Sequence, residues 1–245
     1  MIDISLAEIW DICVKKIYDR KGYIKSLDAL LKREGIERII DPACGTGDPS
    51  LELLNLGYSV EFSDSNEEML EQFYKNSKYK IRSKLIDWRD LSKYYKNEFD
   101  FVLVRSNSLT YAISWSKKDL NPDEARKAIF ESVKNFYQIL RENGILYVDL
   151  YSEDEKPHTR NMGLIVVNDN VEIWEWIIKY DWQSRIRHWK IIREDLLSKE
   201  KMEQYSLSYL IKHQELINML KKVGFCKVNK ADLGGSFYTT YLARK

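Results

Sequence analysis

The chain has 245 residues, and its 39 Lys and Arg against 38 Asp and Glu leave a net charge of +1. This length suits one large α/β domain, with or without an insertion, and allows a full core. The balanced charge and the lack of a basic tail argue against nucleic acid as a partner. No apolar run is long enough to span a membrane, no signal-peptide pattern opens the chain, and three scattered cysteines predict thiols in a reducing cytoplasm.

Strands and helices are predicted to alternate through the first 151 residues. Apolar periodicity over 4–31 predicts one or two helices, within an N-terminal helical segment 1–34. The strands that follow are predicted at 36–40, 58–63, 84–87, 99–104 and 145–150. The helices between them are predicted at 49–56, at 66–73 with Ser65 as N-cap, and at 123–140 after Pro122. This order predicts an α/β fold, a doubly wound and mostly parallel sheet that binds its ligand at the carboxyl ends of the strands.

The pattern changes after Tyr151. Residues 152–160 indicate a loop, and an antiparallel insertion is predicted over 160–210. Its strands are expected at 164–167, 171–180 and 185–193, with 200–210 as a further candidate. A helix at 213–223 and two closing strands at 225–231 and 238–243 follow. We expect 1–245 to be a single domain whose insertion covers the active site or forms a homo-oligomer contact. The insertion holds many aromatics, which favour interfaces, although a local core is the simpler alternative; they are Trp174, Trp176, Trp182 and Trp189.

A glycine loop follows the first predicted strand, in the run Ile39-Ile40-Asp41-Pro42-Ala43-Cys44-Gly45-Thr46-Gly47. Glycine lets the backbone approach a ligand, and the helix start offers free amides. Asp64 ends the next strand about twenty residues later, the place for an acid that binds ribose hydroxyls. No Lys-Ser/Thr pair follows the glycines, and their spacing differs from G-x-G-x-x-G. Asp41 repels a pyrophosphate and suits a cationic or zwitterionic ligand. Together these features predict a nucleoside cofactor other than ATP, GTP or NAD.

This loop and the acid that follows it resemble the class I S-adenosylmethionine methyltransferases. Over about residues 15–151 the sequence is similar to the glycine and sarcosine N-methyltransferase family. The similarity is carried by 38–47, 57–64, Met69-Leu70, Asp87-Trp88, Asn107-Ser108 and 141–146. The resemblance implies a Rossmann-like methyltransferase with a seven-stranded sheet and S-adenosyl-L-methionine as cofactor.

The resemblance also implies which residues bind the cofactor. They are Arg20, Asp41, Ala43, Gly45, Gly47, Asp64, Ser65, Met69, Asp87 and Trp88. Arg20 is expected to bind the tail carboxylate, Asp64 the two ribose hydroxyls and Asp87 the adenine amino group, while Trp88 stacks on the adenine ring. The simpler alternatives are a solvated charge for Arg20, an N-cap for Asp64 and core packing for Trp88. We interpret Cys44 as a small residue under the cofactor rather than a nucleophile. The histidines lack metal-ligand spacing, so no metal is expected.

Methyl transfer is an in-line displacement, so the protein mainly aligns the reactants and excludes water. An amine acceptor must be neutral, and desolvation in the pocket favours the free amine. The catalytic candidates are Asn107, to orient the acceptor, with Tyr23 and Tyr111 as pocket-lining hydroxyls whose rings favour a sulfonium. A turn residue for Asn107 and packing for the tyrosines are the alternatives.

One departure concerns the acceptor. In the glycine-methylating enzymes an arginine after strand five binds the substrate carboxylate, but the matching stretch 148–152 has none and contains Tyr151. Either Arg105 or Arg160 substitutes, or the substrate is not glycine. We therefore expect a small-molecule amine acceptor other than glycine. The alternatives are a methyltransferase acting on RNA or protein, a catalytically silent nucleotide-binding protein of this fold and, less favoured by the loop spacing, a Rossmann oxidoreductase.

Overall fold

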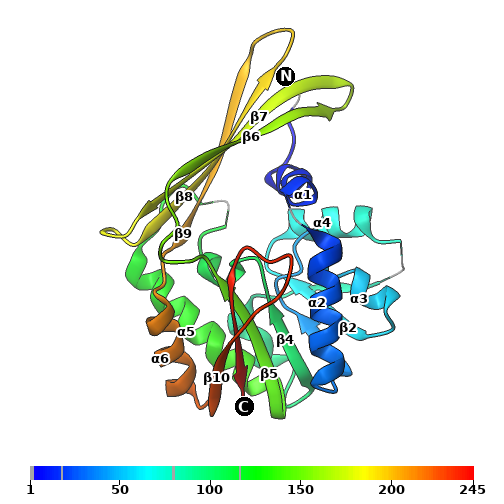
Figure 1. The fold of residues 1–245 in the computed structure, drawn as a ribbon, viewed down its shortest axis with the longest axis vertical. Coiled ribbons are helices and arrows are strands. Elements are labelled where there is room, and N and C mark those ends of the chain that lie inside the picture. Colours follow the sequence, from blue (N-terminus) through cyan, green and yellow to red (C-terminus); the bar gives the residue numbers. More distant parts are fainter. Residues whose placement is uncertain (1–2, 18, 79–80, 116) are drawn as a thin grey trace.

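The computed structural model describes residues 3–17, 19–78, 81–115 and 117–245, and contains two sheets (Figure 1). The larger has seven strands in the order β10-β11-β5-β4-β1-β2-β3. Its parallel strands are β1 (Arg38–Asp41), β2 (Ser59–Asp64), β3 (Ser83–Leu85), β4 (Phe99–Val104) and β5 (Leu140–Leu150). β11 (Thr239–Arg244) pairs antiparallel with β5 and with β10 (Lys227–Ala231). The predicted doubly wound, mostly parallel sheet is confirmed.

Helices cover both faces of this sheet because its central strands are apolar on both sides. Successive strand residues point to opposite faces, so Ile39 and Ile40 enter different cores. Ile39 packs with residues of α2 (Arg20–Arg33). Ile40 belongs to the cluster that includes α5 (Pro122–Ile139) and α6 (His213–Val223). The continuous apolar runs of the sequence therefore become a three-layer α/β/α fold (Figure 1).

The remaining helices differ from the prediction at their boundaries. α1 (Leu6–Ile17) precedes α2, while Met1, Ile2 and Tyr18 of the predicted segment 1–34 lie outside the described residues. The helix predicted at 49–56 is reduced to α3 (Glu52–Asn55), because the residues before it form turns. The helix α4 (Glu67–Asn76) is capped by Asn66 and not by Ser65. Asn66 has the extended backbone that a cap requires, and its Oδ1 accepts from the amide of Met69 at 2.9 Å.

The insertion forms a second, four-stranded antiparallel sheet above the first in Figure 1. Its strands are β6 (His158–Val167), β7 (Asn170–Asp181), β8 (Ile186–Asp195) and β9 (Lys201–Tyr209). The candidate strand at 200–210 is therefore confirmed. The predicted loop 152–160 ends earlier than expected, because β6 already begins at His158. The long strand β7 provides a pairing partner for this residue.

The inner face of the second sheet packs on α1. Trp174, Trp176 and Trp189 are buried there in one cluster with Ile9 and Cys13. These three tryptophans therefore form a local core, the simpler of the two predicted roles. Over the described parts of the chain, no helix combines the length and the apolar character that crossing a membrane requires.

Candidate active site

A cavity lies at the carboxyl ends of the parallel strands, where the chain order reverses around β1. β1 pairs with β2 on one side and with β4 on the other, the arrangement at which open α/β sheets bind ligands. The lining comes from the segments that follow three strands, from two helices and from the region after β3. The lining residues are Trp10, Ala43, Gly45, Asp64, Ser65, Asn66, Met69, Trp88, Ser106, Ser108, Tyr111 and Trp115.

The glycine loop forms one wall of this cavity. Gly45 and Gly47 have φ of +53° and +89°, in the region that favours glycine. A Cβ on Gly47 would lie 2.5 Å from Cδ1 of Leu51 and 2.9 Å from Cδ2 of Phe73. Gly47 therefore permits the turn and the close packing below it, whereas Ala43 and Gly45 line the cavity itself.

Asp41 lies beneath the loop and outside the cavity lining. Its fully buried carboxylate accepts from Ser50 Oγ at 2.5 Å and from the amide of Ala43 at 3.2 Å, and lies 3.7 Å from Nε of Arg105. Burial raises the pKa of this carboxyl, although Arg105 opposes the shift. Arg105 also donates to the carbonyl of Asp48 at 2.5 Å. Asp41 and Arg105 thus hold the loop, and the geometry gives Arg105 a structural task rather than the acceptor contact considered from the sequence.

Asp64 presents its carboxylate to the cavity at the end of β2. Oδ2 accepts from the amide of Gly45 at 2.9 Å, and Oδ1 accepts from the amide of Asn66 at 2.9 Å. Burial raises the pKa of Asp64 to about 6, against the effect of these two hydrogen bonds. Each oxygen keeps acceptor capacity for one more donor, so the group can accept two neighbouring hydroxyls.

Trp88 and Asp87 lie beyond Asp64. The Trp88 ring lines the cavity and also packs at 5.9 Å from the ring of Phe136, so it belongs to both the site and the core. Asp87 lines an adjoining pocket that shares Ser65 and Tyr111 with the cavity. Burial would raise the pKa of Asp87, but hydrogen bonds from Arg89 outweigh it and lower the pKa.

Asn107 is held by Asp149, an acid to which the sequence analysis gave no role. Ser106 and Asn107 have φ of +59° and +57°, and their amides donate to the two oxygens of Asp149, at 3.0 and 2.6 Å. Consecutive residues in this strained region are typical of functional loops. The Asn107 side chain donates to Thr110 Oγ1 at 2.7 Å and accepts from the amide of Tyr151 at 3.4 Å. It therefore does not line the cavity, and its backbone shapes the loop that does.

The other two catalytic candidates occupy different places. The Tyr111 ring lines the cavity, and its hydroxyl accepts from Arg187 of β8 at 2.7 Å. Tyr23 is fully buried in the α2 core, with its hydroxyl 3.4 Å from that of Tyr147, which donates to Asp149 at 3.2 Å. Tyr23 therefore contacts Tyr147 of β5 and does not line the cavity.

Arg20 also lies apart from the cavity. It forms ion pairs with Asp48 and Glu52 and lines a separate pocket with them. The expected contact between Arg20 and a cofactor tail stays a prediction, and Arg20 lies outside the lining of the cavity described here.

Cys44 is buried beside the loop, and burial raises the pKa of its thiol well above the usual value. Such a thiol is a poor nucleophile, in keeping with its interpretation as a small packing residue.

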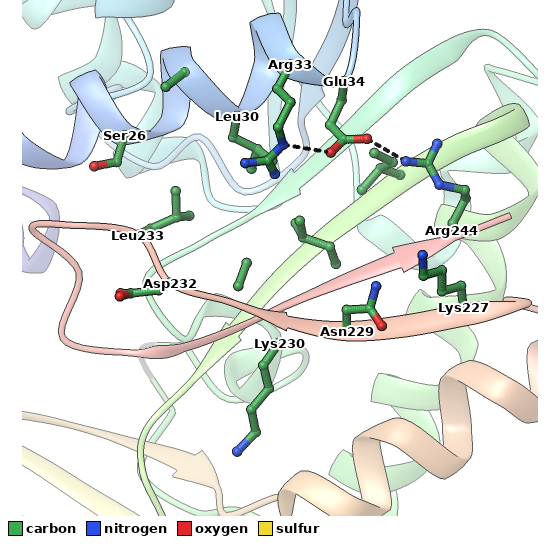
Figure 2. Close-up of a pocket in the computed structure, with 14 residues that line it drawn as sticks. Ser26, Leu30, Arg33, Glu34, Lys227, Asn229, Lys230, Asp232, Leu233 and Arg244 are labelled. Atoms are coloured by element: carbon green, nitrogen blue, oxygen red, sulfur yellow. Dashed lines mark hydrogen bonds and ion pairs between the residues drawn. The ribbon is translucent and has the colours of Figure 1, made fainter.

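Another pocket lies between α2 and the strands β10 and β11 (Figure 2). Figure 2 shows Glu34 between Arg33 and Arg244, with ion pairs of 3.2 and 2.6 Å. The lining of this second pocket includes Ile145, at the opposite end of β5 from the cavity described above. Because this second pocket lies away from the carboxyl ends of the parallel strands, it is the weaker candidate for the active site.

Residues 39–144 match the family model described as Methyltransferase domain. A glycine/sarcosine N-methyltransferase of Aphanothece halophytica is 32% identical over 127 residues, which are 51% of this chain and 44% of that protein. The chain thus spans less than half of that relative.

Two solved structures share the fold over almost the whole chain. The S-adenosylmethionine-bound amino pentose methyltransferase CalS10 of Micromonospora echinaspora has a TM-score of 0.74 at 14% identity, covering 100% of this chain and 99% of its own. The sugar N-methyltransferase KedS8 of a Streptoalloteichus species has a TM-score of 0.75 at 15% identity, with 100% and 96% covered.

Proposed function

We propose that this chain, a class I S-adenosylmethionine-dependent methyltransferase, transfers a methyl group to the amine nitrogen of a small-molecule acceptor. The family model supports the predicted family and, with it, S-adenosyl-L-methionine as the cofactor, and the shared fold agrees with both. Relatives named for glycine, sarcosine and sugar N-methylation support nitrogen as the target and a small molecule as the acceptor. We place the enzyme in the cytoplasm, where its cysteines stay reduced.

The observation that carries the proposal is the Asp64 carboxylate at the cavity formed by the glycine loop. Two backbone amides orient it, and acceptor capacity remains on both oxygens. A ribose diol offers two hydroxyl donors with matching spacing. The Trp88 ring beside it provides a flat apolar surface for a base, with the Asp87 carboxylate in the adjoining pocket. The residues present therefore fit an adenosine group.

The chain itself contributes alignment and desolvation. When bound, the cofactor supplies a methyl group that its sulfonium has already activated. Within the described lining of this cavity, Asp64 is the one carboxylate, and it ends β2. We infer that the acceptor amine loses its proton through desolvation against the aromatic wall of Tyr111 and Trp115.

We infer also that the insertion covers this site. The ring of Trp189 on β8 stacks on Trp115 at 6.4 Å, and Trp10 of α1 contacts both at 6.0 and 5.6 Å. Both Trp10 and Trp115 line the cavity. Closing this aromatic group over the reactants excludes water. The alternative, a homo-oligomer contact through the insertion, predicts a solution mass above that of the monomer.

The deciding experiment is a screen with methyl-labelled S-adenosylmethionine. Glycine, sarcosine, amino sugars, larger amines, tRNA and protein are offered in parallel, while calorimetry measures S-adenosylhomocysteine binding. Label in small amines supports the proposal, and label confined to tRNA or protein would replace it with the macromolecular alternative. Absence of S-adenosylhomocysteine binding at millimolar concentration would favour a catalytically silent protein.

A further inference from the structure

Three arginines among the described residues have little exposed surface, and one of them differs from the others in its partners. Arg105 faces Asp41, and Arg193 binds Glu172 at 2.8 Å. Arg187 is 1% exposed, and its hydrogen-bond partners in the described structure are the hydroxyls of two tyrosines. A charge buried without a counter-ion is costly, so structures rarely keep one without a use.

The side chains in contact with Arg187 are aromatic. One terminal nitrogen donates to the hydroxyl of Tyr111 and the other to that of Tyr151, each at 2.7 Å. The guanidinium carbon lies 4.2 Å from the ring centre of Tyr151 and 5.9 Å from that of Tyr180. Among the residues that the structure describes, none places a carboxylate within ion-pair distance of Arg187. The guanidinium of Arg187 therefore carries a positive charge without a direct ion-pair partner beside Tyr111.

Further polar atoms without partners lie on the same face of the second sheet. The Nε of Arg187, the Nε1 of Trp189 and the hydroxyls of Ser206 and Ser208 are buried and make no hydrogen bond in the described structure. Arg187 pairs in register with Ser208 and Trp189 with Ser206, so the four side chains share one face of β8 and β9. Arginine and tryptophan can only donate. This inner face thus offers a row of donors, and an acceptor-rich anion would satisfy them.

We propose, building on the function proposed above, that Arg187 binds a carboxylate of the methyl acceptor. One guanidinium without a second nearby cation suits a monoanion. Tyr111 lines the cavity while its hydroxyl contacts Arg187, and Arg187 itself does not line the cavity. The acceptor must therefore extend past Tyr111, so its amine and carboxylate are separated by a spacer longer than the single carbon of glycine. An apolar or aromatic spacer suits the walls formed by Tyr151 and Tyr180.

The first test uses binding alone. 4-Phenylbutyrate and its uncharged amide are titrated into the full chain, with S-adenosylhomocysteine present, and into Arg187→Met. Arg82→Met, at an exposed arginine before β3 and outside the cavity lining, is the matched control. We expect 4-phenylbutyrate to bind wild type and the control equally, and to bind Arg187→Met about thirtyfold more weakly, with the amide indifferent to the change. Equal binding of the carboxylate and the amide to wild type, or an unchanged affinity in Arg187→Met, would overturn the proposal.

The second test separates this proposal from the proposed function. S-Adenosylhomocysteine binding is measured in each variant. If the wild type does not bind S-adenosylhomocysteine, the methyltransferase function is refuted, while the carboxylate titration still reports on Arg187. For acceptors found in the screen, Arg187→Met should raise KM for amino carboxylates and leave KM for the decarboxylated amines unchanged. A uniform fall in kcat for both classes would instead mean that Arg187 only orients Tyr111 and Tyr151. Circular dichroism confirms the fold of each variant.

Discussion

Replacing Asp64 tests the cofactor site most directly. The carboxylate ends β2 at the cavity, and the amides of Gly45 and Asn66 hold it in place. Asp64→Ala removes the whole group, whereas Asp64→Asn keeps its size and one carbonyl oxygen but loses the charge. The pair of variants therefore separates the charge from the shape of the site.

The magnitude follows from the hydrogen bonds that the group can still accept. A hydrogen bond to a charged group contributes about 1.5–3 kcal/mol, so Asp64→Ala should weaken S-adenosylhomocysteine binding by about 10–150-fold. Burial raises the pKa of Asp64 to about 6 in the free protein. At pH 7.5 the carboxylate is ionised, whereas at pH 5 only about a tenth of it is, so the wild-type Kd should rise about tenfold between the two.

Calorimetry at pH 7.5, 6 and 5 measures these values, with melting curves to confirm that each variant is folded. Asp64→Asn should bind more weakly than wild type at pH 7.5 and show little change with pH. Asp149 has a similarly raised pKa of about 6, so a pH dependence that persists in Asp64→Asn would belong to another group. An unchanged Kd in a folded Asp64→Ala protein would refute the assignment of the ribose site.

The remaining predictions concern the loop, its thiol and the buried acid. Gly47→Ala should lower the free energy of unfolding by about 1–3 kcal/mol more than Gly57→Ala in chemical denaturation, because both glycines have φ of +89° but only the first would clash, with Leu51; equal losses would contradict this. Cys44→Ala should keep methyl transfer within about twofold and iodoacetamide should not inactivate wild type, since a buried, high-pKa thiol is inert. Burial raises the pKa of Asp149 to about 6, so the folded chain binds more protons than the unfolded one and stability rises as pH falls from 7 towards 4. Asp149→Asn should reduce this slope in thermal melts, and an unaltered slope would count against it.

Local patterns accounted for most of the fold. The apolar run 99–104, the helix after Pro122 and the helix 213–223 were predicted at or within a residue of their bounds, because neighbouring residues alone determine periodicity and caps. The start of β6 was missed because its pairing partner is another strand. Boundaries that depend on partners from other elements carry little local signal.

The candidate site divides in the same way. The structure brings Ala43, Gly45, Asp64 and Trp88 to one cavity, and each stands at the end of a predicted strand or just after it. The side chain of Arg20 instead forms an ion pair with Asp48, and that of Asn107 donates a hydrogen bond to Thr110. Their partners come from elements whose positions follow from packing, which the chain order does not reveal.

The sequence by itself determined the methyltransferase architecture, because alternating strands and helices with a glycine loop and an acid after strand two bring those groups to one edge of the sheet. Only the tertiary structure decided which arginine reaches Tyr111 of the cavity lining. Arg105 directly follows β4 but is used beside Asp41, whereas Arg187 reaches Tyr111 from the second sheet. The one sequence signal for Arg187 was its alternation with Trp189 and Ile191 along β8, which places its charge on the buried face of the strand. Its meaning depends on which groups the two sheets leave unpaired where they meet, a property of packing and burial rather than of local sequence.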